Sequence, residues 1–491
     1  MLDHQQKEEL SHAMWHVLEA SRGAADPSDV RDCALALLLL KYMSDCRRSD
    51  RHTTAAPAAE CGWFMPDGAD FYALLADQHK AGNAQRIDRA LHAIEEANHF
   101  LEGVSQQLRF DFTAWGNAEQ KDRALAHLLS SFAVNTLDFR SWGDSAPEAV
   151  AYACDTLIKQ TATAIGKKGG EFFTPPELSQ LIARLMQAEP GESISDPFCG
   201  SGTLLMTCGQ LAQQKSGHQG SCSLYGQEKN GRTWALAHIN MVLHGENQAQ
   251  LAWGDTLRDP KFLAKDDGRT LQTFDVVVSC PPFSLREWGH EDALHDPWRR
   301  YRRGVPPRAS GDYAFISHMV ETLKARTGRM AVVVSLGVLF RGGAEQQIRE
   351  KLLQENLVDA VIALPPKMLP HTAIPVALLV LRKGKADDHV LFIDASLGYQ
   401  HGKLQNALRE DDLARIESAY QRREDFPKYS RRVSLVEIVS NGHNLNVARY
   451  IDATDDEETL DLGTLRAERD QIRAELAHLE ARMAELIMEV E

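Results

Sequence analysis

Hydrophobic positions in the first 150 residues recur at the period of an α-helix. One face of the first predicted helix carries Leu10, Met14, Val17 and Leu18. A second helix is expected to begin at Pro27 or Ser28, with Asp29 in its first turn. The helical pattern continues over 99–101 and 124–132, whereas residues 52–66 contain several Ala and Pro and are expected to form a loop. The sequence thus predicts a helical N-terminal domain over residues 1–150.

From near Lys167 the pattern changes to short apolar runs that alternate with helical segments. This alternation predicts an α/β domain over residues 151–451, with a doubly wound parallel sheet. The expected strands are 193–195, 223–225, 249–253, 274–279, 330–335, 358–364 and 376–381. The expected helices are 203–214, 232–243, 313–325 and 345–356. The strand at 376–381 is expected to finish the sheet.

The end of the chain carries a seven-residue repeat. One heptad position holds Leu465, Ile472, Leu479 and Leu486. The companion position holds Leu462, Arg469, Leu476, Met483 and Val490. About four such heptads predict a coiled-coil helix over 462–490, after an acidic linker, in a third part spanning 452–491. A helix packed on its own domain gives the same pattern, but the terminal position after that linker favours docking on a partner helix.

Composition and charge narrow the class of protein. Of the 491 residues, 43% are hydrophobic and 25% are charged, which is ordinary for a soluble globular protein. The longest apolar run near the N-terminus, 34–40, is too short for a bilayer, so we expect no membrane contact and a cytoplasmic location. The eight cysteines form no CxxC pair, so neither a metal site nor a disulfide framework is expected. The net charge of −15 implies that any nucleic acid is bound through a local basic surface and a partner.

The sharpest motif lies between the first predicted strand and the helix that follows it. It reads Asp196-Pro197-Phe198-Cys199-Gly200-Ser201-Gly202. Glycines in such a turn let the backbone approach a ligand closely, and the next helix offers unpaired N–H groups. The spacing is neither the G-x-G-x-x-G of dinucleotide sites nor that of a P-loop. The spacing therefore disfavours a site for a nicotinamide dinucleotide and excludes a P-loop.

Two carboxylates follow the next two predicted strands. Glu228 comes just after the second strand and can accept hydrogen bonds from both hydroxyls of a ribose. Asp255 comes just after the third strand and can accept a hydrogen bond from an adenine amino group. Either carboxylate alone is more often a helix cap or a solvated loop residue. Together, after a glycine turn, they favour an adenosine-type ligand.

With these motifs the chain resembles, over almost its whole length, the modification subunits of type I restriction-modification systems, which are γ-class N6-adenine DNA methyltransferases. The resemblance implies a Rossmann-like class I fold that uses S-adenosyl-L-methionine. It implies that the DPFCGSG turn binds the methionine part of that cofactor, through Asp196, Gly200, Ser201 and Gly202. A preceding segment closes over the cofactor in the family and here reads Gly170, Glu171, Phe172, Phe173, Thr174, Pro175 and Pro176. Further family-like blocks are 240–245, 304–307, 311–315, 337–341 and 444–446.

The catalytic motif departs from the family. The family has N-P-P-[FY] after the fourth strand, and this chain has Cys280, Pro281, Pro282 and Phe283. In the family, the Asn oxygen and the carbonyl of the next Pro accept the two hydrogens of the adenine amino group, and the aromatic residue stacks on the flipped base. A thiol is a weak acceptor, and Cys280 has no obvious neighbouring base that would lower its pKa.

Several interpretations of Cys280 stay open. The site is an impaired but active one, or the chain binds cofactor and assembles without methylating, or the substitution leaves the fold untouched. A cytosine-C5 methyltransferase with a cysteine nucleophile is disfavoured, because the order there is Pro then Cys. Two functions follow: an adenine-N6 methyltransferase, and a cofactor-binding scaffold of a defence complex.

A basic run and the family resemblance bear on partners. Residues 299–303, Arg-Arg-Tyr-Arg-Arg, with Arg308, lie after the catalytic motif. They are either a solvated loop or a surface for DNA phosphates, and their nearness to Phe283 favours DNA. The resemblance implies double-stranded DNA as substrate, read by a separate specificity subunit. It also implies a second modification subunit and a restriction subunit as partners.

Overall fold

The structure is a computed structural model. It describes residues 2–20, 26–50, 63–110, 115–166, 172–215, 217, 220–266, 268–370, 372–452 and 462–488, with the backbone alone at 49–50, 462–465 and 484–488. The chain forms two compact units, Met1–Ile451 and Asp452–Glu491. Most of the loop expected at 52–66 lies outside the described residues, and residues 63–66 have no regular structure.

The N-terminal region is helical, as predicted. Its α-helices are α1 (His4–Glu19), α2 (Pro27–Asp50), α3 (Phe71–Ala76), α4 (Asn83–Ala97), α5 (Val104–Gln107), α6 (Ala118–Ser131) and α7 (Ala146–Ile165). Short 3-10 turns separate some of them, including η1 (His99–Leu101) and η4 (Phe139–Ser145). Asp3 caps α1 by accepting a hydrogen bond from the Gln6 amide. The boundary expected between residues 150 and 151 falls inside α7, which packs on α1 and α2.

The rest of the first unit is built around one nine-stranded sheet. Its strands lie in the order β3-β2-β1-β4-β5-β7-β6-β8-β9. The seven strands predicted from the sequence are present as β1 (Ser193–Asp196), β2 (Ser223–Glu228), β3 (Gln250–Trp253), β4 (Val276–Ser279), β5 (Arg329–Ser335), β6 (Val358–Ala363) and β7 (Val376–Arg382). β1 to β5 pair in parallel, and β7 is antiparallel to both β5 and β6.

The expectation that 376–381 finishes the sheet is wrong. β8 (Val390–Asp394) pairs in parallel with β6, and β9 (Ser430–Val433) pairs antiparallel with β8. β8 is an apolar run that is buried along most of its length, as expected for a strand covered on both faces. β9 reads Ser-Arg-Arg-Val and has little apolar signal, because an edge strand needs to bury one side only.

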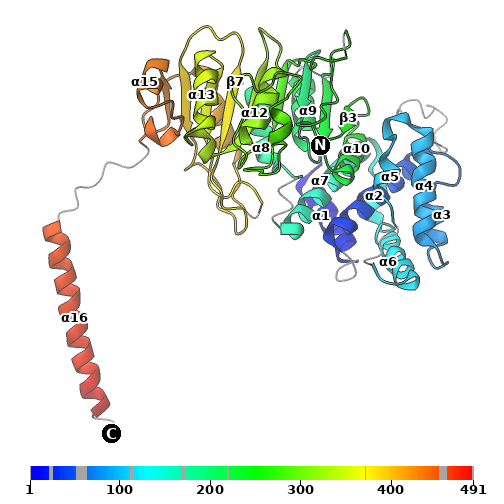
Figure 1. The fold of residues 1–491 in the computed structure, drawn as a ribbon. Helices are drawn as coiled ribbons and strands as arrows, with labels where there is room; N and C mark the ends of the chain where they lie inside the picture. Colours follow the sequence, from blue (N-terminus) through cyan, green and yellow to red (C-terminus); the bar gives the residue numbers. More distant parts are fainter. Residues whose placement is uncertain are drawn as a thin grey trace. The chain divides into compact units, whose positions relative to one another are not determined.

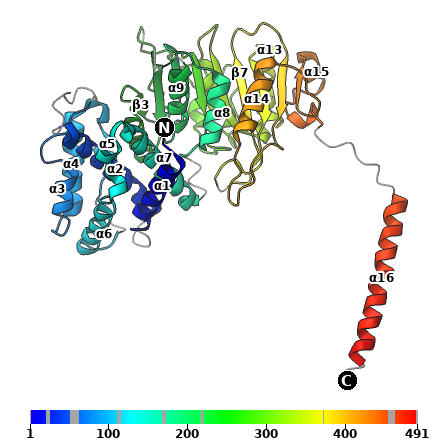
Figure 2. The same ribbon diagram turned by 180° about the vertical axis from the view of Figure 1, so that it is seen from behind.

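Helices cover both faces of the sheet (Figures 1 and 2). One face packs against α8 (Pro176–Met186), α9 (Thr203–Lys215) and α14 (Glu410–Arg422) in one apolar cluster. The other face packs against α12 (Asp312–Glu321) and α13 (Ala344–Gln354) in a second cluster. Because β1 to β4 are parallel, their carboxyl ends lie along one edge, where ligands of doubly wound sheets bind. The short elements α11 (His290–Ala293), η6 (Leu336–Leu339) and α15 (Leu435–Ser440) lie in the connections.

Helix α10 (Gly231–Leu243) joins the sheet to the N-terminal helices. It contacts β2 and β3 on one side and α2, α5 and α7 on the other. Figure 1 shows the N-terminal helices on the side of the sheet where β3 is the edge strand. At the first turn of α10, Arg232 donates hydrogen bonds to Asp29 and Asp32 of α2, both at 2.7 Å. The helical region therefore packs directly on the sheet through α10, instead of being joined to it only by a flexible linker.

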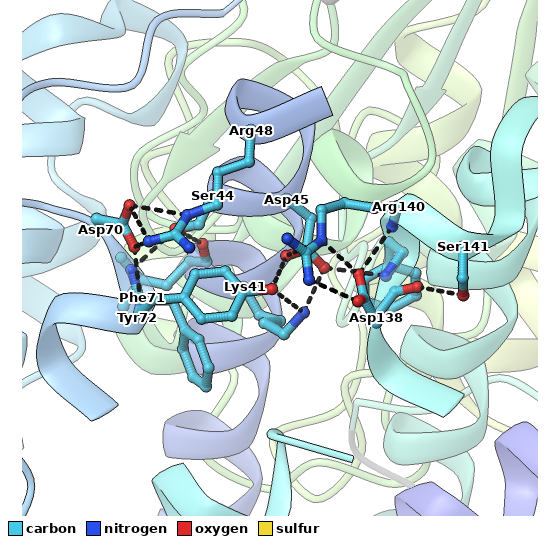
Figure 3. Close-up of polar contacts among 12 residues, drawn as sticks. Lys41, Ser44, Asp45, Arg48, Asp70, Phe71, Tyr72, Asp138, Arg140 and Ser141 are labelled. Carbon is cyan, nitrogen blue, oxygen red and sulfur yellow. Dashed lines mark hydrogen bonds and ion pairs between the residues drawn. The ribbon is translucent and has the colours of Figure 1, made fainter. Parts of the chain in front are cut away.

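A buried ionic cluster holds α2, α3 and η4 together (Figure 3). Lys41 of α2 pairs with Asp45 one turn later, and both side chains are almost fully buried. The Tyr72 hydroxyl donates to Asp45 at 2.5 Å, and the Phe139 amide donates to the other carboxylate oxygen at 2.9 Å. Asp45 therefore links three segments that are far apart in the sequence.

The second unit contains α16 (Leu462–Met488), which confirms a helix over the heptad repeat. Its apolar side chains are exposed: Ile472 60%, Leu476 55%, Leu479 61% and Met483 61%. In the described part of the chain, no helix is both long and apolar enough to cross a membrane.

Candidate functional site at the carboxyl edge of the sheet

The glycine turn after β1 is tightly built. The Cys199 amide donates to the Gln227 carbonyl at 3.0 Å, and the Gly202 amide donates to the Cys199 carbonyl at 2.8 Å. Gly200 has φ 54°, and a Cβ placed there would lie 2.8 Å from the Phe172 carbonyl oxygen. Both the left-handed conformation and the close approach therefore require glycine at position 200.

The segment at 172–176 lies directly over this turn. The Ser201 amide donates to the Phe172 carbonyl at 2.9 Å. The side chains of Phe172 and Phe173 are buried in the core of the N-terminal helices. Pro176 begins α8, where a proline in the first turn is favourable, and Pro175 is the N-cap residue. The structure thus brings the two predicted motifs together, whereas Gly170 and Glu171 lie outside the described residues.

Glu228 faces the same turn from the end of β2. Its carboxylate accepts hydrogen bonds from the Gly200 amide at 3.1 Å and from the Asn230 amide at 2.7 Å. Burial raises the pKa of Glu228, and the backbone hydrogen bonds act against that shift. The structure thus holds the Glu228 carboxylate beside the glycine turn, and its ribose-binding role stays a prediction.

Asp255 lies at the neighbouring strand end, with its side chain already engaged. It forms an ion pair with Lys229 at 2.8 Å and accepts a hydrogen bond from the Leu257 amide at 3.1 Å. The next residue, Thr256, donates its hydroxyl hydrogen to the Pro197 carbonyl at 2.6 Å. Thr256 is buried and ties the Asp255 loop to the glycine turn, a role that the sequence analysis missed.

Asp196, the first residue of the motif, is buried at the end of β1. Burial raises the pKa of Asp196 to about 7, with a contribution from nearby Glu228, although hydrogen bonds from Ser279 and the Phe198 amide act against it. A carboxyl group that ionises near neutral pH can exchange its proton for a cationic ligand group. This behaviour is typical of binding and catalytic sites.

Cys280 lies beside this turn because β4 pairs with β1. Burial raises the pKa of Cys280 to about 12, Asp196 adds to that shift, and a side-chain hydrogen bond with Thr174 acts against it. The group is therefore a neutral thiol at pH 7, as the absence of a neighbouring base predicts. Pro281 is buried, Pro282 is exposed, and Phe283 is half-buried at the end of the motif.

A buried asparagine behind the turn was missed as a site residue. The Asn240 amide nitrogen donates to the Ser201 carbonyl at 2.8 Å, and its oxygen accepts from the Cys154 thiol at 3.4 Å. Asn240 is fully buried in α10, among apolar residues. A lone Asn on a buried helix face signals a needed hydrogen bond, and that signal was available in the sequence.

Two arginines of the basic run, Arg300 and Arg303, are buried and cannot contact DNA, whereas Arg299, Arg302 and Arg308 are exposed, and for these the DNA contact stays a prediction. Arg300 and Arg303 are 1% and 2% exposed. Arg300 pairs with Asp296 at 2.8 Å and donates to the Leu257 carbonyl at 2.7 Å. Arg303 bonds Glu321 at 2.5 Å and Glu355 at 2.6 Å. These guanidinium groups are structural, because buried arginines need paired carboxylates and carbonyls.

The sheet, the glycine turn and the acidic strand ends define a class I S-adenosylmethionine-dependent methyltransferase fold with a helical N-terminal region, as expected from the sequence. Residues 146–459 match the family model described as N-6 DNA Methylase. The chain therefore belongs to the N-6 DNA methylase family, and its relatives place it with the methylase (modification) subunits of type I restriction enzymes.

Two relatives and one solved structure illustrate the similarity. The MpnII methylase subunit of Mycoplasma pneumoniae is 26% identical over 537 residues, covering 99% of this chain and 97% of that subunit. The MjaVII methylase subunit of Methanocaldococcus jannaschii is 31% identical over 353 residues; the match covers 69% of this chain and 57% of that subunit. The type I methyltransferase subunit of Streptococcus thermophilus superposes with TM-score 0.78 at 28% identity, covering 91% of this chain and 100% of that one.

Proposed function

We propose that the chain transfers the methyl group of S-adenosyl-L-methionine to adenine N6 in double-stranded DNA. The observation that carries this proposal is the meeting of three predicted motifs at one sheet edge. The Phe172 carbonyl accepts a hydrogen bond from the Ser201 amide at 2.9 Å, and Glu228 accepts one from the Gly200 amide. The side chains of Thr174 and Cys280 are also hydrogen-bonded to each other. These contacts support the proposal because the residues assigned to the cofactor and those assigned to the base are then neighbours.

The residues of this edge suit S-adenosyl-L-methionine. The Glu228 carboxylate can accept hydrogen bonds from the ribose hydroxyls. Asp196 can pair with the amino group of the methionine part, and Asp255, once released from Lys229, can accept a hydrogen bond at the adenine end. Gly200 keeps a side chain out of the space under the 172–176 segment. When bound, the cofactor supplies an electrophilic methyl group.

The chain's own residues would orient the adenine. The Pro281 carbonyl accepts one amino hydrogen, and Phe283 stacks on the extruded base. Cys280 is the weak element, because a neutral thiol is a poor acceptor for the second hydrogen. We therefore expect transfer that is slower than an Asn at position 280 would support.

The proposed target reader is a separate specificity subunit. The exposed apolar side chains of α16 support docking of the 462–490 helix on that partner. A second modification subunit and a restriction subunit complete the proposed complex. Because the substrate is cellular DNA, the proposed site of action is the cytoplasm.

The neutral thiol of the half-buried Cys280 also favours a second candidate function. In this case the chain binds S-adenosyl-L-methionine and assembles a restriction complex without methylating DNA. Both candidates predict cofactor binding, so methyl transfer separates them.

The test measures transfer of labelled methyl from S-adenosyl-L-methionine to unmethylated DNA by the chain co-purified with its specificity subunit. Cys280→Asn restores the amide acceptor, and Cys280→Ala is the matched control that removes the thiol without adding one. By analogy with the loss of one oriented hydrogen bond at a transition state, Cys280→Asn should raise the rate by about 10²–10³, whereas Cys280→Ala should not. If calorimetry shows cofactor binding and none of the three proteins methylates adenine, the scaffold function replaces the enzyme.

A further inference from the structure

The residue that follows Phe283 has a backbone conformation that L-amino acids rarely adopt. Ser284 has φ 51° and an exposed side chain. Such a conformation persists where the surroundings hold it. Here the backbone amide of Ser284 is fixed by the hydrogen bond that it donates to Asp312 Oδ1 at 2.7 Å.

Asp312 is itself firmly fixed. It is the first residue of α12, and its side chain is 4% exposed. Its second oxygen, Oδ2, accepts from Arg341 Nη2 at 2.6 Å and from the Ser310 hydroxyl at 3.0 Å. A neighbouring backbone bond, from the Gly311 amide to the Leu285 carbonyl at 2.9 Å, fixes the same stretch. A buried carboxylate with both oxygens engaged is a rigid anchor.

The anchor extends to helix α13. Arg341 Nε lies 3.0 Å from Glu345 Oε2, and the Arg341 carbonyl accepts from Arg349 Nη1 at 3.1 Å. Arg349 is 1% exposed and also donates to the His443 carbonyl at 2.7 Å. The blocks at 311–315 and 337–341, which the sequence analysis singled out without a role, thus meet behind the loop that carries Phe283.

We infer that Asp312 is a positioning residue for methyl transfer, which holds Ser284 in its left-handed conformation and so directs Phe283 toward the extruded base. The inference rests on the proposed function, since Phe283 acts on the base there. Asp312 itself touches no reacting group in this scheme. Its effect should therefore appear in the DNA-dependent step and not in cofactor binding.

Three variants of the full chain test this. Asp312→Ala removes the acceptor, and Asp312→Asn keeps a neutral oxygen that can still accept from Ser284. Ser284→Pro removes the donor and forbids the positive φ while leaving the Asp312–Arg341 pair in place. Asp292→Ala, on an exposed aspartate paired with Arg258 at 3.3 Å, is the matched control.

We expect Asp312→Ala and Ser284→Pro to lower methyl transfer by about a hundredfold, because small misplacements of site residues have effects of that size. The dissociation constant for S-adenosyl-L-methionine should stay within about twofold of the unmodified protein's value. Asp312→Asn should recover a large part of the rate. Should Asp312→Ala fail to fold, Ser284→Pro still decides, because it leaves the Asp312–Arg341 pair in place.

Amide hydrogen exchange over residues 281–288 reads out the same contact without any substrate. Asp312→Ala should speed exchange of the Ser284 amide by at least about tenfold, and Asp292→Ala should not. Unchanged exchange overturns the inference, as does a parallel loss of cofactor binding and methyl transfer. If exchange responds while the unmodified chain and Cys280→Asn both fail to methylate, the proposed function fails, and with it the part of the inference that concerns the base.

Discussion

Arg31 of α2 lies over the ring of Phe172, with its guanidinium carbon 4.5 Å from the ring centroid. The carbonyl of the same Phe172 accepts a hydrogen bond from the Ser201 amide at 2.9 Å. The N-terminal helices therefore reach the glycine turn through one aromatic residue. A cation over an aromatic face contributes about 0.5–2 kcal/mol, more when it is desolvated.

Arg31→Ala should therefore weaken binding of S-adenosyl-L-methionine by roughly 3–10-fold, through loss of the contact that fixes Phe172. Asp32 would not be left unpaired, because Arg232 Nε also donates to it at 2.7 Å. Isothermal calorimetry measures the affinity, and Arg123→Ala, in an exposed pair with Glu119 at 2.9 Å, is the control. Equal affinities for the two variants would argue against a link between α2 and the cofactor site.

Gly200→Ala should lower cofactor affinity by more than the backbone strain at this position alone explains. An added Cβ would meet the Phe172 carbonyl oxygen at 2.8 Å, so the turn or the 172–176 segment must move. Gly191 also has a positive φ, 87°, but a Cβ there meets nothing within 4 Å. Gly191→Ala therefore carries a comparable strain, about 1–2 kcal/mol, without the collision. We expect cofactor affinity to fall at least about tenfold for Gly200→Ala and to be unchanged for Gly191→Ala; similar affinities would contradict this geometry.

The pKa of about 7 at Asp196 predicts a pH-dependent stability. Because burial raises the folded-state pKa above its ordinary value, protonation of Asp196 favours the folded chain. This contribution is complete below about pH 4 and is lost as the pH rises through 7. It amounts to at most about 4 kcal/mol. Urea unfolding at several pH values between 4 and 8 should show Asp196→Asn gaining stability relative to the unmodified protein as the pH rises. Parallel pH profiles for the two proteins would show that the carboxyl group ionises normally.

The same carboxyl group makes cofactor affinity depend on pH. If Asp196 pairs with the cationic amino group of S-adenosyl-L-methionine, binding requires its ionised form. Affinity should then rise by up to about tenfold per pH unit below pH 7 and level off above it. Asp196→Asn should flatten this dependence, and calorimetry in buffers of different ionisation enthalpy should detect the released proton. A pH-independent affinity in the unmodified protein would exclude that pairing.

Local patterns were enough to predict most of the sheet and the glycine turn. β4 is a run of valines, and the turn after β1 depends on glycines whose conformational freedom is a local property. β9 was missed because its Ser-Arg-Arg-Val sequence acquires strand character only by pairing with β8. The helix over the heptad repeat was found from periodicity alone.

Contacts between distant segments could not be predicted from one sequence. Arg303 looked like part of a basic surface, but its partners Glu321 and Glu355 lie 18 and 52 residues away. The Asp312–Ser284 bond, 28 residues apart, likewise depends on how α12 packs beside the loop after β4. Such roles become visible only when the burial and pairing of each side chain are known.

The buried Lys41–Asp45 pair provides a test of what holds the N-terminal helices together. Burial lowers the pKa of Lys41, and its hydrogen bond to Asp45 acts against that shift. Asp45→Ala would strand this cation together with the Tyr72 hydroxyl and the Phe139 amide, so we expect a loss of about 3–5 kcal/mol in the free energy of unfolding. Asp67, which pairs with Arg47 and is 95% exposed, is the control. Asp67→Ala should cost less than about 1 kcal/mol.

Replacing both partners of the buried pair sharpens this test. In Lys41→Met with Asp45→Leu no buried charge is left unpaired, which often restores stability. Here the restoration should be incomplete, because the Tyr72 and Phe139 donors still lack the acceptor that Asp45 gives them. Each stranded donor should cost about 1–3 kcal/mol. Urea denaturation of the single and double variants measures these losses. Full recovery of the free energy of unfolding in the double variant would mean that Asp45 acts only as a counter-ion. Partial recovery would mean that Asp45 also holds α2, α3 and η4 together.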